Sequence, residues 1–177
     1  MRSRDHMRLV EADAFIQECR RHGKSAKDVR NAVDTFASTL AKTGLVQSLL
    51  LAIKSQCGDS VRYALTKELA SWLISDSAPT KSIASEIINQ PGHNHLAPAP
   101  RLALGLVACQ SNSKIMAIQA EAIAWVAKLK LVAQARAAEE AAEKAAEKAA
   151  EKERSQKEQE AQTQQQQPEK PGEKDGE

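Results

Sequence analysis

Apolar side chains recur every three or four residues along most of the first 137 residues, and nowhere do they alternate with period two. This is the period of an amphipathic α-helix, so we expect an all-α chain folded as a compact bundle of six or seven helices. Gly23 should end the first helix, and Ser25 with Asp28 should cap the second. The apolar stripes span residues 9–19, 29–40, 45–53, 61–73, 83–88, 102–109 and 115–133.

Two segments between these stripes indicate breaks in the bundle. Gly44 can supply a left-handed stop, after which residues 45–53 are apolar almost all round and should lie in its middle. Residues 90–100 contain three prolines and a glycine, which predicts the longest loop of the body.

The sequence changes character near residue 137. Residues 138–155 repeat Ala, Glu and Lys, a composition that favours a solvated helix extending the last one of the body. A coiled coil is not expected there, because large apolar residues are missing from the repeat. Residues 156–177 are rich in Gln, Glu, Pro and Gly and should be disordered.

The net charge of +2 conceals an uneven distribution. Residues 1–137 hold 18 Lys and Arg against 11 Asp and Glu, a net charge of +7, whereas residues 138–177 hold 7 against 12, a net charge of −5. A basic body favours a polyanionic partner such as nucleic acid, because bound phosphates release their counterions. The same excess of charge also serves solubility.

The cysteines and the apolar runs indicate the compartment. Cys19, Cys57 and Cys109 are far apart and odd in number, which predicts buried, reduced thiols rather than disulfides. The first residues are polar and basic, and no apolar run reaches the roughly 18 residues of a membrane span. We therefore expect a cytoplasmic protein.

Catalytic motifs are missing from the sequence. The seven glycines are isolated from one another, so no glycine-rich phosphate loop is present. His93 and His95 could share a metal ion, but two histidines without a nearby carboxylate or thiol make a poor site, and a solvated loop explains them as well. The sequence predicts a protein that is not an enzyme and holds no metal or cofactor.

Residues 40–50 have the outline of a helix-turn-helix, with Gly44 at the turn. A recognition helix needs polar side chains that reach base edges. Here the second helix offers only Gln47 and Ser48 before a run of apolar residues, so we interpret it as a core helix.

Three features in order resemble one protein family. Gly44-Leu45-Val46-Gln47 begins an apolar helix that ends in Lys54, a further helix ends in Trp72-Leu73, and the last core helix carries residues 121–128, Glu-Ala-Ile-Ala-Trp-Val-Ala-Lys. Across residues 29–135 this order and spacing resemble the small subunit of type III-B CRISPR effector (Cmr) complexes. The long loop at residues 90–100, the scarcity of aromatic residues and the acidic tail depart from the family pattern.

The resemblance implies an all-helical, non-catalytic subunit that acts in antiviral defence. Copies of it would stack along the backbone subunits of an RNA-guided complex and hold the guide–target RNA, while a backbone subunit cuts the target and the large subunit responds. Base pairing then reads the sequence, so the small subunit needs only phosphate contacts.

Six basic residues are candidates for RNA contact. Lys54 and Lys128 match basic positions of the family pattern, and Arg62, Lys67, Lys114 and Lys130 lie on or beside polar helix faces. Any of them could also be an ordinary solvated side chain. Trp72 and Trp125 could stack on bases, but each falls beside an apolar stripe, which favours packing.

Two other functions fit the same sequence. A protein-interaction adaptor would use the helical body for one partner and the acidic tail for another, and a small DNA-binding regulator would use the helix-turn-helix outline. Salt-sensitive retention of single-stranded RNA separates the RNA-binding protein from the adaptor.

Overall fold

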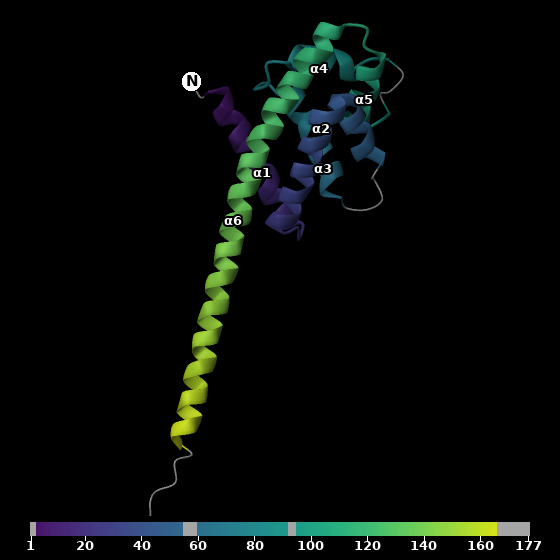
Figure 1. Ribbon diagram of the computed structural model, residues 1–177. Coiled ribbons are helices and arrows are strands. Elements are labelled where there is room, and N and C mark those ends of the chain that lie inside the picture. The colour runs from purple at the N-terminus through teal and green to yellow at the C-terminus, as the bar shows by residue number, and fades with distance from the viewer. Residues whose placement is uncertain (1–2, 55–59, 92–94, 166–177) are drawn as a thin grey trace, which may run out of the picture. The chain divides into compact units, whose positions relative to one another are not determined.

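The structure, a computed structural model, describes residues 3–54, 60–91 and 95–165, with side chains as far as residue 157. It confirms the all-α expectation (Figure 1). Six helices are present in this part of the chain: α1 Arg4–Arg21, α2 Ala26–Lys54, α3 Val61–Ile74, α4 Lys81–Ile88, α5 Pro98–Ala108 and α6 Asn112–Gln165.

The turn between α1 and α2 forms as the local sequence predicts. Gly23 adopts a φ of 75°, and the N–H groups of Lys24 and Gly23 donate to the carbonyls of Cys19 and Arg20 at 3.1 and 2.9 Å. This is the paired hydrogen bonding of a Schellman C-cap. The Ser25 hydroxyl accepts from the Asp28 N–H at 3.1 Å and donates to its carboxylate at 2.7 Å, which caps α2.

Gly44 divides α2 into two helical segments. Its φ of 78° is positive, as expected for a glycine at a helix break, and its ψ of 175° lies outside the helical region, so the two segments meet at a kink. The expectation that residues 45–53 lie in the middle of the bundle is wrong. Leu45, Leu49 and Ala52 are buried, but Leu50 and Leu51 are 39% and 48% exposed, because the segment packs through only one face.

By length and composition, α2 is apolar enough to span a membrane. Core helices of globular proteins meet the same criterion, and α2 contributes nine buried residues to the body. Its composition is therefore weak support for a membrane span, and a protein without one remains our prediction.

Helices α4 and α5 approach each other closely. A Cβ atom at Gly105 would lie 2.3 Å from the carbonyl oxygen of Ile87, so only glycine fits at this crossing. Helix α5 begins at Pro98, earlier than expected, because prolines in a first helical turn have no hydrogen bond to lose. The predicted loop is correspondingly shorter.

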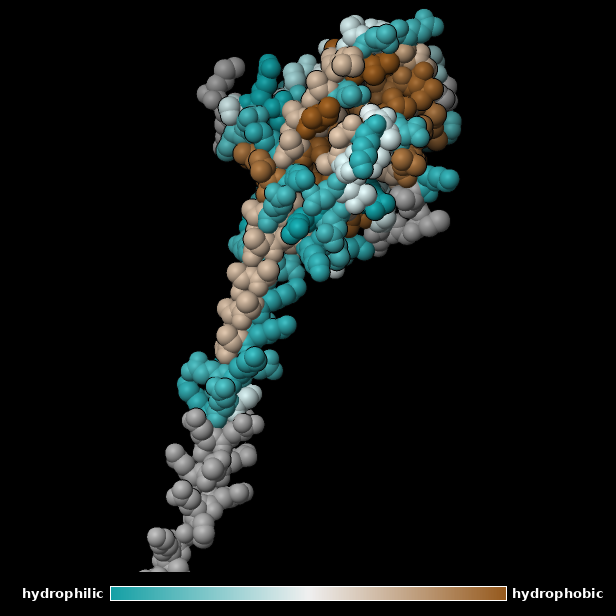
Figure 2. Space-filling model, in the orientation of Figure 1, coloured by the Kyte–Doolittle hydropathy of each residue, from teal (hydrophilic) through white to brown (hydrophobic). Residues whose placement is uncertain are grey.

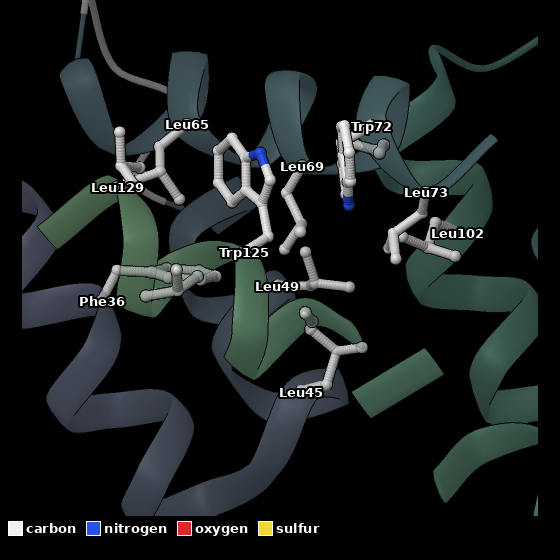
Figure 3. Packing of buried hydrophobic residues seen from close by; sticks show 14 of the residues in the cluster. Phe36, Leu45, Leu49, Leu65, Leu69, Trp72, Leu73, Leu102, Trp125 and Leu129 are labelled. Atoms are coloured by element: carbon white, nitrogen blue, oxygen red, sulfur yellow. The ribbon is translucent and has the colours of Figure 1, made fainter. Parts of the chain in front are cut away.

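The core gathers around Trp125 of α6 (Figure 3). Its ring is fully buried and lies between Leu65 and Leu69 of α3. Trp72 is 3% exposed. Both tryptophans therefore pack inside the body, and neither presents its ring to a base from solution.

The chain separates into two compact units, Met1–Ala138 and Glu139–Glu177. Apolar side chains gather on the first unit, whereas the described side chains of the second are charged, polar or small (Figure 2). Helix α6 continues beyond residue 155, where we expected helical order to end, as far as Gln165. Residues 166–177, the rest of the tail that we expected to be disordered, lie outside the described residues.

Candidate nucleic-acid interface

Three of the six candidate basic residues form ion pairs within the body. Lys114 pairs with Glu86 at 2.5 Å, Lys128 with Asp5 at 3.0 Å, and Lys130 with Asp34 at 3.0 Å. Lys128 lies well inside α6, and its side chain is only 26% exposed, because α1 packs alongside.

Lys128 belongs to a charged network that joins α1, α3 and α6. Glu121, whose side chain is 4% exposed, accepts two hydrogen bonds from Arg8 at 3.0 and 2.7 Å and one from the Trp72 indole at 2.8 Å. Asp5 accepts a hydrogen bond from Arg8 at 2.7 Å. Its interaction with Lys128, and to a lesser extent that with Arg8, lowers the pKa of Asp5. These interactions hold α1, α3 and α6 together. Because the charges are paired within the network, few of them are available to a ligand.

Glu121 was not singled out from the sequence, where it is named only as the first residue of the segment 121–128. A signal was present, because Glu121 lies one turn before Trp125 and beside Ile118 and Ala122 on the apolar stripe. A carboxylate at such a position needs a buried partner.

The other three candidates are exposed. Lys54 lies at the end of α2, and Arg62 and Lys67 lie on α3. None of them forms an ion pair within the described parts of the chain. Their charges are therefore available to an external anion.

Two neighbouring grooves meet at the first turn of α3 and share Ser60 and Val61. The larger lies between α1 and α3 and has a volume of about 870 Å³, and the smaller lies between α2 and α3 with about 370 Å³. Lys67 lines the larger groove and Arg62 the smaller one, so these two candidates lie in neighbouring grooves. Lys54 lines neither.

The larger groove contains basic residues that the sequence reasoning missed. Arg21, His22 and Lys24, from the end of α1 and its turn, line it opposite Lys67. The signal was a run of basic residues from Arg20 to Lys27. Glu18 offsets part of this charge, since it pairs with Arg21 at 2.6 Å and with His22 at 3.1 Å.

The half-buried Glu68 and the buried Cys19 line the same groove. Burial is the main cause that raises the pKa of Glu68, and the negative charge of Glu11 raises it further. Burial also raises the pKa of Cys19 to about 11. Cys19 is therefore a protonated, unreactive thiol at neutral pH. It is buried as expected, whereas Cys109 is half-buried and Cys57 lies outside the described residues.

The proposed histidine pair falls partly outside the structure. His95 is exposed, and His93 is not among the described residues. Across the residues that the structure describes, no three metal-binding side chains come together.

Comparison with protein-family models, curated proteins and solved structures finds no match for this chain. The resemblance to the effector small subunits therefore rests on the residues of the chain itself, and what it implies about function is a proposal.

Proposed function

We propose that this protein is a non-catalytic, cytoplasmic small subunit of a type III CRISPR effector complex, which holds guide–target RNA through phosphate contacts. The observation that carries the proposal is a set of three exposed cations, Arg62 and Lys67 on α3 and Lys54 at the end of α2, none of which forms an ion pair within the described residues. Lys114, Lys128 and Lys130 contribute less, because each would first have to leave a carboxylate. The partners proposed are the guide–target RNA, the backbone and large subunits, and further copies of this chain.

The chemistry of these basic residues suits a nucleic acid that is recognised by its phosphates and shape rather than by its base sequence. Lysine and arginine contact phosphates irrespective of sequence, and both tryptophans are buried. Polar side chains that could read base edges are scarce on the second segment of α2, whose Ser48 is buried and bonded to the Gly44 carbonyl at 2.7 Å. This favours RNA holding over sequence-specific DNA binding.

One observation supports the adaptor as a second candidate. Met116, Ile123 and Leu131 are exposed on α6, on the face opposite Trp125. An apolar stripe of this kind suits contact with another protein. A subunit of a larger complex also has such contacts, so the stripe agrees with both functions.

The test of RNA holding is the triple variant Lys54→Glu, Arg62→Glu, Lys67→Glu. For the wild-type chain we expect log affinity for single-stranded RNA to fall against log salt with a slope of about −2, as for three phosphate contacts. The triple variant should bind weakly to every RNA sequence, with a much shallower slope. Fluorescence anisotropy with labelled RNA over a range of salt concentrations measures both quantities.

A matched control is Lys148→Glu, Lys152→Glu, Arg154→Glu. It makes the same change in net charge at exposed positions of the second unit. It should keep most of the wild-type affinity. Equal losses in the two variants would show that total charge, rather than the three exposed cations, governs binding, and a folded triple variant with wild-type affinity would contradict the proposed contacts.

A further inference from the structure

The groove between α1 and α3 combines an apolar interior with a charged rim. Phe15, Cys19, Val61 and Ala64 supply apolar surface, and Tyr63 adds an aromatic ring. Lys24 and Lys67 supply cations, one from each side of the groove. Proteins that bind single-stranded nucleic acid combine an aromatic platform with a positive track in this way.

The size of the groove favours an unpaired strand. Its volume of about 870 Å³ lies in the range of pockets that enclose a small ligand. A paired base stays inside its duplex, whereas an unpaired base can turn outward and enter a groove of this kind. The smaller groove with Arg62 continues past Ser60 and Val61, which gives the strand a path for its next phosphate.

The two carboxylates of the groove, Glu18 and Glu68, lower its positive charge but are outnumbered by Arg21, Lys24 and Lys67. Glu18 already pairs with Arg21 and His22. Glu68 is half-buried, and no hydrogen-bond partner for it exists in the described part of the chain. A carboxylate in that state accepts hydrogen bonds, and the ribose hydroxyl that distinguishes RNA can donate one.

We propose that the groove between α1 and α3 receives one or two unpaired nucleotides of an RNA strand, with a base against Tyr63 and the flanking phosphates on Lys24 and Lys67. This inference rests on the proposed RNA-holding function. It adds the position of the RNA strand and the statement that the strand is unpaired at that position. Each subunit would hold its strand by stacking as well as by charge.

The direct test compares labelled oligouridine with an oligonucleotide of equal length that carries abasic sites, using the full chain. Loss of base stacking should weaken binding by roughly 5- to 150-fold. Tyr63→Leu should weaken oligouridine binding over the same range and abolish the difference between the two ligands. Tyr63→Phe keeps the ring and should behave as the wild type, and a fully paired duplex should bind the wild type and Tyr63→Leu alike.

The outcomes separate this inference from the function on which it rests. Equal affinity of the wild-type chain for both oligonucleotides, with the expected salt slope, would refute the groove and leave phosphate holding intact. Absence of RNA binding would refute both. Unchanged RNA binding by Tyr63→Leu, with loss of a co-purifying subunit, would assign the groove to a protein contact and overturn the proposal. The abasic comparison needs no substitution, so it decides the question even where a Tyr63 variant folds poorly.

Discussion

Replacing Glu121 with alanine is expected to lower the free energy of unfolding by about 3–5 kcal/mol, the cost of breaking a buried ion pair. The substitution leaves Arg8 largely buried without its carboxylate and removes the acceptor of the Trp72 indole. Because folded domains are stable by only about 5–15 kcal/mol, this loss is a large part of the total stability. Urea denaturation followed by circular dichroism measures the change.

Glu86→Ala is the matched control. Glu86 forms an ion pair with Lys114 of α6, but this pair is on the surface and should contribute at most about 1 kcal/mol. Arg8→Ala and the Arg8→Ala, Glu121→Ala double variant complete a cycle, in which the double variant should lose less than the sum of the single losses. Strict additivity would contradict a direct interaction between the two side chains.

Trp125→Ala is expected to destabilise the body by about 3–5 kcal/mol, because a large buried ring is lost and a cavity remains. Trp125 is fully buried, and its indole N–H has no acceptor among the described residues, so the ring acts through packing alone. Met116→Ala, on the exposed face of the same helix, should change stability by less than about 0.5 kcal/mol. Urea denaturation followed by circular dichroism compares the two, and similar losses would contradict the assignment of the two faces of α6.

Local features of this fold follow directly from the sequence. The cap by Ser25 and Asp28 and the turn at Gly23 depend on residues within one helical turn, and both form as expected. The core stripe of α6 follows from helical periodicity in the same way, since Ile118, Ala122, Val126 and Leu129 are buried. Short-range patterns carry this information because helix caps and helix faces are determined by near neighbours.

Features that depend on distant residues could not be predicted. Lys128 and Lys54 look equivalent in the sequence, yet Asp5, far away along the chain, pairs with only one of them. The exposure of Leu50 and Leu51 has the same origin, because the number of packed faces depends on how many helices surround the segment. The larger groove joins the end of α1 to the start of α3, so periodicity within either helix gives no sign of it.

The most direct test of the central claim is purification of the tagged, full-length chain from cells that produce it naturally, followed by sequencing of the bound RNA and identification of the bound proteins. We predict a guide RNA together with backbone and large effector subunits. The Lys54, Arg62 and Lys67 triple variant should retain less RNA than the Lys148, Lys152 and Arg154 control. Recovery of protein partners without RNA would contradict the RNA-holding function and establish the adaptor in its place.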